Sequence, residues 1–560
     1  MNVIRFFARN ARSKLFVVVA AGTVSGLSSM VLLALFAAVL KGGSRYSAFT
    51  LICVLLALCL FLPLTRFISE VILLRLAQAE LFNLRMRLSR RILQSALRHL
   101  EILGSEPLMT ALTDDIPGIV DALHLIPPLC LNIAIALSGF IYLGLLSWRI
   151  LLLVLGFFVL GLLVYELPSR LSGKHFRAAR QELDVLWGHF KDLTEGVKEL
   201  KLHSRRRHVF LSQVLRDTAA ARSKHLLSAF NFHGMANSLG QMLVFAAIGL
   251  ILFTYAGSHS GIAVPAGSII TLLYISSALQ FVMNELPSII SADIALQRLD
   301  GLTRQLEGPG VMELQQEVAT DVGLRCERLA LKAVTHAYHS KQAKEAFTLG
   351  PININLKAGE LVLVAGGNGS GKTTLAKIIT GLYPAETGEL LLDGQPITEE
   401  NREFYRQHFS AIFYDFYLFE SLLGLEKPDL DEHARERLTR LQLNGVVAIE
   451  NGVLSTTQLS QGQRKRLALL TATLEDRPIY VFDEWAADQD PEFKDFFYRE
   501  LLSDLKAKGK LVIIICHDDH YFDVADRMIK LESGKVIYDG IPAASPSKEM
   551  KQVTALSGLG

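Results

Sequence analysis

The stretch GGNGSGKTT, beginning at Gly366, has the residue types and the spacing of a loop that binds phosphate. Its glycines let backbone N–H groups turn toward phosphate oxygens, and the start of the following helix adds its positive dipole. Lys372 is placed to reach the β and γ phosphates, and the Thr373 hydroxyl can coordinate magnesium. The predicted nucleotide contacts here are Gly366, Asn368, Gly369, Ser370, Gly371, Lys372, Thr373 and Thr374. The motif follows the strand-like ELVLVAG and precedes the helix-like TLAKIITGL, which predicts ATP binding.

Two further strand-like runs end in groups suited to hydrolysis. PIYVFDE ends in Asp483 and Glu484, at the carboxyl end of a strand, where open parallel sheets bind ligands. Asp483 suits a magnesium shell, and Glu484 suits a general base that orients and deprotonates water. KLVIIICHD ends in His517, whose imidazole could donate to the γ-phosphate. Isolated adjacent carboxylates could merely start a helix, but the phosphate loop favours a catalytic set of Glu484, His517 and Lys372, with ATP and Mg²⁺ as cofactors.

These groups must be positioned by a parallel α/β domain, since short β-branched runs alternate with helical stretches in the carboxyl-terminal part. We predict this nucleotide-binding domain over residues 322–560. A polar segment, 298–321, contains the break EGPG at Glu307 and is predicted to be a linker. Half of the whole chain is hydrophobic, and the apolar residues concentrate in the first 297 positions. That portion is predicted to be membrane-embedded.

Apolar runs in residues 1–297 are long enough for six membrane-spanning helices. The predicted spans are Leu15–Leu40, Ala48–Leu64 with a polar continuation, Leu125–Ser147, Ile150–Leu167, Leu239–Tyr255 and Gly267–Ile290. Only SWR, at Ser147 to Arg149, separates the third and fourth, so these form a tight hairpin. The second-to-third and fourth-to-fifth connections are long. The predicted fold is therefore a six-span α-helical domain followed by an α/β phosphate-loop domain.

Charge placement predicts the orientation of these spans. The long connections carry RMRLSRR from Arg85 and HSRRRH from His203, whereas no Lys or Arg lies between His225 and Gln297. Basic residues near spans favour the cytoplasmic side, so both connections and both termini are predicted to be cytoplasmic in a multi-pass membrane protein. The basic clusters are expected to face membrane lipids rather than nucleic acid, because no aromatic residues interleave them.

LSQGQRKR, beginning at Leu459, resembles the LSGGQ signature of ATP-binding cassette (ABC) proteins. In that family two nucleotide domains meet head to tail, and each signature contacts the nucleotide held by the other domain. The resemblance assigns this contact to Ser460, Gly462 and Gln463, although Gln461 replaces a glycine. With one cassette per chain, it implies a homodimer.

Resemblance to the same family nominates further nucleotide contacts. VTHAYHS places Tyr338 where such proteins stack an aromatic ring on adenine, although an aromatic in an early strand is often a core residue. AADQD aligns with the D-loop and nominates Asp490. The family has a glutamine at the end of the strand that precedes its helical subdomain. Here Tyr414 takes that position and Asp415 follows it, so either residue is a candidate for sensing magnesium. The short interval from Tyr414 to Leu459 implies a small helical subdomain.

Membrane helices followed by a cassette on one chain is the layout of exporters of this family. GSEPLMTALTDD from Gly104 and DLTEGVKELKLHS from Asp192 resemble the segments that dock on the cassettes. Four stretches resemble the bacterial cyclic-peptide and siderophore exporter family, which includes pyoverdine-precursor, syringomycin-type and microcin exporters. They are FTLGPININLKAGE from Phe347, IFYDFYLFESLLG from Ile412, VFDEWAADQDPEFKDFFYRELLSDLKAKGK from Val481 and CHDDHYF from Cys516.

The resemblance implies ATP-driven export of a peptide or peptide-like natural product across the bacterial cytoplasmic (inner) membrane by alternating access, with possible periplasmic or outer-membrane partners. A lipid flippase would share every motif, so it stays an alternative. A membrane regulator that does not transport would be expected to lack catalytic residues, which are present. Glu285 could line a cargo cavity, because an ionisable group within a membrane is costly without a cavity or a partner. Arg66 and Glu70, four apart on one helix face, could simply pair with each other.

Overall fold

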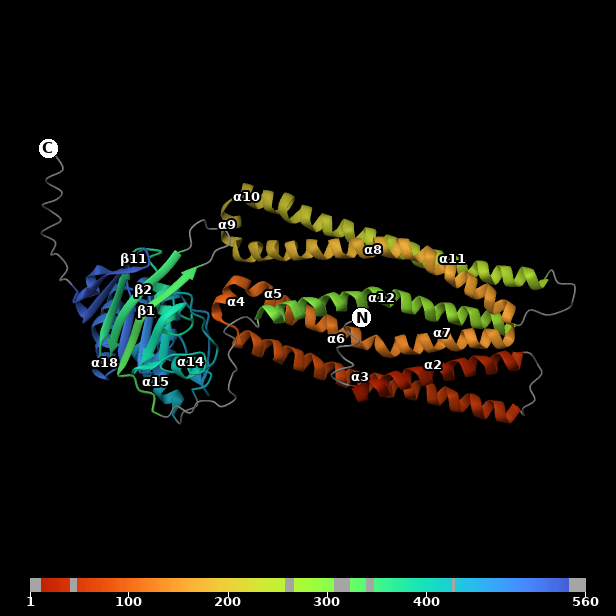
Figure 1. Ribbon diagram of the computed structural model, residues 1–560, viewed down its shortest axis with the longest axis horizontal. Helices are drawn as coiled ribbons and strands as arrows, with labels where there is room; N and C mark the ends of the chain where they lie inside the picture. The colour runs from red at the N-terminus through yellow and green to blue at the C-terminus, as the bar shows by residue number, and fades with distance from the viewer. Residues whose placement is uncertain are drawn as a thin grey trace. The chain divides into compact units, whose positions relative to one another are not determined.

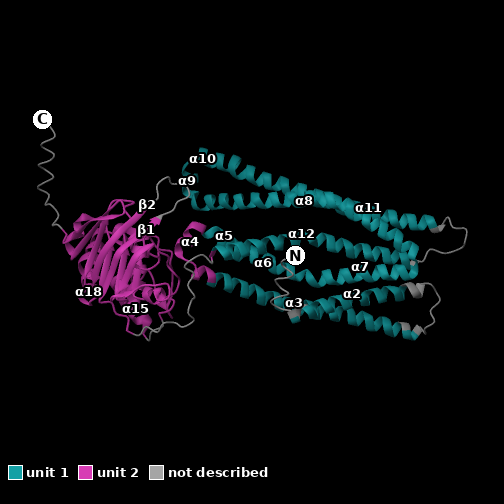
Figure 2. Ribbon diagram, viewed as in Figure 1, with its two compact units in different colours: residues 1–90, 105–305 teal, residues 91–104, 306–560 magenta. Residues whose placement is uncertain are grey.

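The architecture comes from a computed structural model, which describes residues 12–40, 48–256, 266–306, 323–338, 347–425 and 429–542. The chain forms two compact units, coloured separately in Figure 2. The first, called the membrane unit here, is made of residues 1–90 and 105–305. The second, the cassette unit, is made of residues 91–104 and 306–560. The predicted domain boundaries differ from this division, because the cassette unit includes a short segment from the first third of the chain.

Long helices and the short helical segments between them build the membrane unit (Figure 1). They are α2 (Arg12–Leu40), α3 (Ala48–Gln94), α5 (Ser105–Thr110), the π-helix η1 (Ala111–Asp115), α6 (Ile116–His124), α7 (Ile126–Leu146), α8 (Trp148–Glu195), α9 (Val197–Leu202), α10 (Ser204–Val209), the π-helix η2 (Phe210–Leu215), α11 (Arg216–Ala256) and α12 (Ala266–Leu306). Within the described residues, six helical stretches are long and apolar enough to cross a membrane, as the sequence predicts. The predicted hairpin is also present, because only Ser147 separates α7 from α8.

Several of these helices extend well beyond the predicted spans. Polar residues continue α3 past Leu64 to Gln94 and α8 past Leu167 to Glu195. The last membrane helix, α12, continues to Leu306, into the segment that the sequence predicts to be a linker. An α-helix satisfies its own backbone hydrogen bonds in lipid and in water alike, so nothing forces it to stop at the membrane surface. Apolar composition therefore marks the spans but not the helix ends.

Close packing between helices depends on small residues in the membrane unit. A Cβ added at Gly26 on α2 would lie 2.6 Å from the Leu131 carbonyl oxygen and 2.6 Å from the Ala134 Cβ of α7. Large apolar side chains point outward instead, for example Leu145, Leu60 and Phe253, which are 82%, 73% and 81% exposed. Outward apolar side chains and small residues at helix contacts are typical of helices that lie in lipid.

The described residues of the cassette unit form three sheets, and the largest positions the predicted site. Its strand order is β12-β11-β3-β10-β9-β6, and β11, β3, β10, β9 and β6 run parallel. A four-stranded antiparallel sheet has the order β2-β1-β4-β5, and β7 pairs with β8. The strands are β1 (Arg328–Tyr338), β2 (Phe347–Lys357), β3 (Leu361–Gly366), β4 (Thr387–Leu392), β5 (Gln395–Pro396), β6 (Phe409–Ile412), β7 (Ile449–Glu450), β8 (Val453–Leu454), β9 (Ile479–Asp483), β10 (Leu511–Ile515), β11 (Arg527–Glu532) and β12 (Lys535–Gly540).

Helices cover the main sheet and enclose two hydrophobic clusters. They are α13 (Lys372–Ile379), α14 (Arg402–Arg406), α15 (Leu430–Arg440), α16 (Gln461–Glu475), η3 (Trp485–Asp488), α17 (Pro491–Asp495), η4 (Phe496–Leu501), α18 (Leu502–Ala507) and η5 (Asp519–Val524). Successive residues of β10 alternate between the clusters, with Val512 and Ile514 in one and Ile513 and Ile515 in the other. This sheet buried on both faces explains the continuous apolar run in the sequence. Between residues 414 and 459, the described part contains one helix, α15, which agrees with the small subdomain expected.

A short helix from between the second and third membrane helices belongs to the cassette unit. This is α4 (Leu97–Leu103), shown with the cassette in Figure 2. The Arg98 Nη1 atom lies 3.0 Å from Glu386 Oε1, and Lys377 Nζ donates to Glu101 Oε1 over 2.7 Å. The Tyr383 hydroxyl also donates to Glu101. The residues that join α4 to the rest of this unit therefore lie just before Gly104, and docking by the segment that begins at Gly104 stays a prediction.

Candidate nucleotide site

The phosphate loop joins β3 to α13, as the sequence predicts. Gly366 has a φ of 152°, and a Cβ there would lie 2.3 Å from the Leu531 carbonyl oxygen, so only glycine fits. Lys372 Nζ folds back onto the loop and donates to the carbonyls of Gly366 and Gly367, at 3.1 and 3.0 Å. Burial lowers the pKa of Lys372, while the carboxylates of Glu484 and Asp483 act in the opposite direction. The lysine is thus held beside both acids.

Asp483 ends β9 with its side chain only 1% exposed. Neither carboxylate oxygen has a hydrogen-bond partner of normal geometry among the described residues. Burial raises the pKa of Asp483, the nearby Thr373 hydroxyl partly offsets this, and the Glu484 carboxylate adds to it. A buried carboxylate with both oxygens unsatisfied is costly alone and fits the oxygen ligands that Mg²⁺ prefers. The buried Ser370 hydroxyl, also without a partner in the described residues, adds a donor at the loop.

Glu484 and His517 meet at neighbouring strand ends. Because β9 and β10 are parallel and pair Asp483 with Ile515, the residues just beyond them share one edge of the sheet. His517 Nε2 lies 2.9 Å from Glu484 Oε1, and both side chains are partly exposed. The backbone at Glu484 is left-handed, with a φ of 51°, which turns the chain sharply after Asp483. The catalytic set predicted from the sequence is therefore assembled in one place.

The signature residues begin α16. Ser460 caps this helix: its hydroxyl accepts from the backbone N–H of Gln463, whose side chain accepts from the Ser460 N–H. The same side chains predicted to contact nucleotide thus form a capping box, which their spacing also encodes. The Gly462 carbonyl accepts from Gln489 Nε2 over 3.1 Å. The predicted contact of Ser460, Gly462 and Gln463 with the nucleotide of a second chain stays a prediction.

Residues that sequence reasoning missed join α16 to the segment 485–490. Arg466 Nη2 lies 2.5 Å from Asp490 Oδ2, and its Nε donates to Gln489 Oε1 over 2.9 Å. Asp490 also accepts from the Phe493 N–H, and these donors lower the pKa of its carboxyl, the backbone N–H most. Lys465, one position before Arg466, is buried and pairs with Asp488. The basic run RKR could have indicated these ion pairs, but basic residues that follow a signature are more simply interpreted as a solvated helix face.

The remaining candidates from the sequence have different outcomes. Tyr414 follows β6 and is 58% exposed, with Lys465 Nζ 5.7 Å from its ring centroid. The charge of Asp415 contributes to the raised pKa of Asp483, which places Asp415 near the candidate magnesium site. Of the two, Asp415 therefore has an electrostatic link to Asp483, the carboxylate predicted to hold magnesium. Tyr338 ends β1, but its side chain lies outside the described part of the structure.

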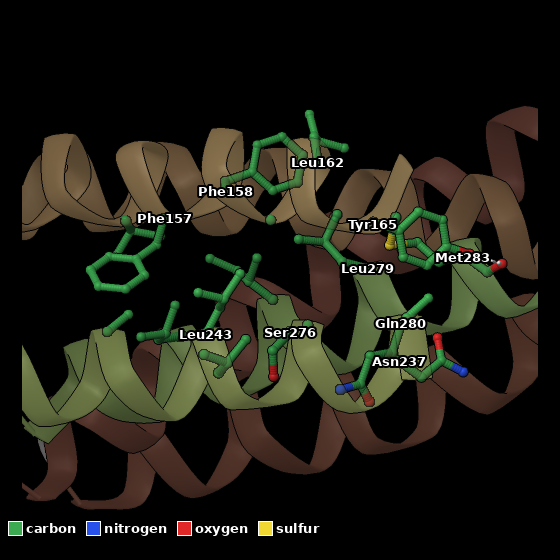
Figure 3. Close-up of a pocket in the computed structure, with 18 of the residues that line it drawn as sticks. Phe157, Phe158, Leu162, Tyr165, Asn237, Leu243, Ser276, Leu279, Gln280 and Met283 are labelled. Carbon is green, nitrogen blue, oxygen red and sulfur yellow. Dashed lines mark hydrogen bonds between the residues drawn. The ribbon is translucent and has the colours of Figure 1, made fainter. Parts of the chain in front are cut away.

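The membrane unit contains a mainly apolar pocket between α7, α8, α11 and α12 (Figure 3). Figure 3 shows Tyr165, Asn237 and Gln280 together at one end, and Phe157 and Leu243 toward the other. The pocket thus gathers three polar residues at one end, and the remainder is apolar apart from Ser276. Glu285, predicted as a possible cargo contact, is not among the lining residues, whereas its neighbour Asn284 accepts from Asn237 Nδ2 over 2.8 Å. Arg66 and Glu70 pair as expected, at 2.9 Å.

Comparisons with known proteins agree with both units. Residues 14–283 match the family model described as ABC transporter transmembrane region, and residues 349–487 match the model described as ABC transporter. The chain is 38% identical over 469 residues to ATP-binding protein SyrD of Pseudomonas syringae pv. syringae, covering 82% of each protein. It is 26% identical over 411 residues to ATP-dependent lipid A-core flippase of Pectobacterium atrosepticum, covering 67% of this chain and 66% of the relative.

A solved structure extends the likeness to nearly the whole fold. The structure of a bacterial Atm1-family ABC exporter with ATP bound matches with a TM-score of 0.72, covering 99% of this chain and 97% of that one. The sequences are only 16% identical, so this likeness concerns the fold alone. It agrees with the predicted order of six membrane helices followed by a nucleotide-binding domain.

Proposed function

We propose that this chain, which belongs to the ABC exporter family, exports a peptide or peptide-like natural product from the cytoplasm. Like the family, it is a multi-pass protein of the inner membrane that couples ATP hydrolysis to transport. In this proposal two copies form a homodimer with both termini in the cytoplasm. Each cassette binds ATP with its own phosphate loop and meets the signature of the other.

The pocket in the membrane unit is the observation that carries the proposed cargo class. Phe157, Phe158 and Leu243 offer apolar surface, while Tyr165, Asn237 and Gln280 offer hydrogen-bonding groups at one end. Such a mixture suits a molecule with apolar side chains and amide groups, because few but placed polar groups orient a ligand in an apolar pocket. The similarity to SyrD over most of both chains supports the proposal of a peptide-like cargo.

The assembled groups give a route to hydrolysis. Lys372 neutralises charge on the β and γ phosphates, and Asp483 with Thr373 would hold Mg²⁺, which screens the phosphate oxygens when bound. Glu484 orients a water and takes its proton as the water oxygen bonds to the γ phosphorus, while the bond from that phosphorus to the β–γ bridging oxygen breaks and ADP leaves with the electron pair. In this proposal His517, whose Nε2 lies 2.9 Å from Glu484 Oε1, donates to the γ-phosphate once ATP is bound. Closing and reopening a dimer around two nucleotides would then drive alternating access.

A lipid flippase is the second candidate, and one observation favours it. The apolar stretch of the pocket also fits an acyl chain, and the chain is similar at lower identity to lipid A-core flippases. The two candidates differ in where the cargo ends. An exported peptide leaves the membrane for the medium, whereas a flipped lipid stays in the bilayer.

The test compares metabolites inside and outside native cells carrying the wild type or Glu484→Gln at equal membrane abundance. Mass spectrometry should find a peptide-like compound that accumulates in Glu484→Gln cells and disappears from their medium. A conservative variant at an exposed position of the same unit, Glu492→Gln, serves as the control and should export normally.

The proposal of peptide export fails if no peptide-like compound changes while the protein is made. Purified protein reconstituted in vesicles then decides for the second candidate, by scoring the transfer of labelled lipid between leaflets with ATP. Transfer by the wild type that is lost in Glu484→Gln would establish a flippase.

A further inference from the structure

Lys465 is a buried cation in the cassette unit to which neither the sequence motifs nor the proposed mechanism gives a role. It lies on α16, and its side chain is 1% exposed. Its Nζ donates to the Glu484 carbonyl oxygen over 3.0 Å and lies 2.6 Å from Asp488 Oδ2. Lysine is almost never fully buried unless its charge is paired, because an ammonium group loses its hydration on burial. The contacts that compensate this loss here all lead to the hydrolysis site.

The bond to Glu484 fixes a backbone that needs support. Glu484 has a φ of 51°, a left-handed conformation that is unfavourable for a residue other than glycine. The Lys465 ammonium holds the carbonyl on one side of this turn, and His517 meets the carboxylate on the other. The Ala487 N–H also donates to this carbonyl, over 3.3 Å, so removing the ammonium leaves one donor and loosens the turn that carries the carboxylate.

The third contact of the ammonium is with an unusual residue. Lys465 Nζ lies 5.7 Å from the ring centroid of Tyr414, within the range of a cation–π contact. Tyr414 stands where the family resemblance leads us to expect glutamine. A tyrosine ring can attract a cation from α16, whereas the amide of glutamine would act through hydrogen bonds. The ammonium therefore lies where the segment after β6, the end of β9 and the segment 485–488 meet.

We propose that Lys465 is a positioning residue for ATP hydrolysis: its ammonium holds Glu484 in the conformation that orients water, with Asp488 and the Tyr414 ring completing its surroundings. The inference rests on the proposed role of Glu484 as general base. It predicts that removing the ammonium slows the chemical step and leaves nucleotide binding in place.

The test uses full-length protein purified into lipid nanodiscs. Lys465→Met keeps the length of the side chain and removes the charge, and Lys465→Arg restores a cation. We expect Lys465→Met to lower kcat about 10- to 30-fold, because small displacements of a catalytic group are costly, with KM within about twofold. Trapping of Mg-ADP-vanadate should fall in parallel with kcat, while binding of trinitrophenyl-ATP should hold. Lys465→Arg should recover a large part of the loss.

Lys510 provides a matched control within the same unit. Its Nζ donates to the Asp476 carbonyl over 3.1 Å and lies 2.9 Å from Asp476 Oδ1. Asp476 is also left-handed, with a φ of 52°, at the opposite end of α16. Lys510→Met therefore removes the same kind of bond from the same kind of turn, away from the predicted catalytic groups. We expect it to lower thermal stability and to keep kcat near the wild-type value.

Tyr414 tests the ring contact separately. Tyr414→Phe keeps the ring and serves as the reference, and Tyr414→Leu should have a kcat about two- to fivefold below that of Tyr414→Phe, as the modest strength of a long cation–π contact predicts. Equal rates in both would remove the ring from the proposal. These variants and Lys465→Arg also carry the test if Lys465→Met does not fold.

Two results would overturn the inference. One is a kcat for Lys465→Met within twofold of the wild type. The other is an equal loss of kcat and nucleotide affinity that Lys510→Met reproduces, since that pattern indicates a general structural role. Glu484→Gln, measured in parallel, separates a failure of the proposed base from a failure of the proposed role of Lys465. Normal hydrolysis by Glu484→Gln refutes the assignment of the base, whereas an inactive Glu484→Gln beside a normal Lys465→Met refutes the role of Lys465 alone.

Discussion

In the cassette unit, charged side chains such as Lys465 and Asp483 are 1% exposed, whereas in the membrane unit apolar side chains such as Leu145 and Phe253 are more than four-fifths exposed. Buried charge requires specific partners at specific positions, because the cost of desolvation is recovered only in the right geometry. Outward apolar surface requires only that side chains be apolar. The same chain thus contains one unit whose chemistry depends on individual residues and one that depends mainly on composition.

This difference extends to the two candidate sites. The nucleotide site is built from single atoms at hydrogen-bonding distance, such as Glu484 Oε1 and His517 Nε2. The pocket of the membrane unit is built mainly from apolar contact, with a few polar groups at one end. Conservative substitutions should therefore have large effects in the first and small ones in the second. The predictions below test that contrast in order of decreasing effect.

The largest effect is expected from Glu484→Gln, which keeps the shape of the side chain and removes the base. We predict a loss of at least about 100-fold in kcat for ATP hydrolysis, the usual size of a general-base contribution. Phosphate release from purified protein measures it, with Glu492→Gln as the control. A turnover within tenfold of the wild type would contradict the assignment.

A smaller effect, on cargo export, is expected from removing the carboxylate by which α4 contacts the rest of the cassette unit. Glu101 accepts from Lys377 and Tyr383, and removing it leaves both donors without this acceptor. We predict that Glu101→Ala lowers cargo export about tenfold, a typical coupling energy between two sites, while trinitrophenyl-ATP binding is unchanged. The double variant Glu101→Lys with Lys377→Glu should restore part of the export. If it does not, the ion pair is not the source of the coupling.

The sequence predicts the architecture well because two strong signals mark it. Apolar length indicates all six spans, and strand-loop-helix context around Gly366 indicates the phosphate site. Helix ends were less predictable: α12 continues to Leu306 because a helix satisfies its own backbone on either side of the membrane surface. The assembly of Glu484 and His517 was predictable because parallel strands place their carboxyl ends at one edge.

Features that arise from tertiary contact could not be predicted from the sequence. Nothing in the local sequence around Leu97 shows that α4 packs in the cassette unit, because its partners Lys377 and Glu386 lie far along the chain. The burial of Lys465 was equally hidden, since a lysine in a basic run is usually solvated. The capping box of Ser460 and Gln463 was readable, but the signature resemblance drew attention to another role for the same residues.

The pocket offers a matched pair of substitutions on α11 with a moderate expected effect. Gly240 lines the pocket, Gly249 does not, and a Cβ added at either meets nothing within 4 Å. Gly240→Leu should fill part of the pocket and reduce export and cargo-stimulated ATP hydrolysis about three- to tenfold, the scale of a few apolar contacts. Gly249→Leu should behave as the wild type. Equal export by both variants would place the cargo elsewhere.

The smallest effect concerns Asp483 and can be read as thermal stability. Burial raises the pKa of this carboxyl above its ordinary value of 3.8, so the folded protein binds its proton more tightly than the unfolded chain does. Stability without ligand therefore falls as the pH rises from about 3.8 through the raised pKa, and at neutral pH the ionised carboxylate is a net cost.

Asp483→Asn removes that charge. We predict that at pH 7.5 it raises the melting temperature of the nucleotide-free protein by about 1 to 4 °C, as expected for about 1 kcal/mol in a domain of this size. It should also abolish the additional stabilisation that Mg²⁺ gives in the presence of ATP, because the metal loses its carboxylate ligand. Scanning fluorimetry with and without Mg²⁺ measures both. A variant that is less stable without ligand, yet still stabilised by Mg²⁺, would show that Asp483 serves packing rather than the metal. The cassette unit would then lose its clearest example of a buried charge that is kept for a specific ligand.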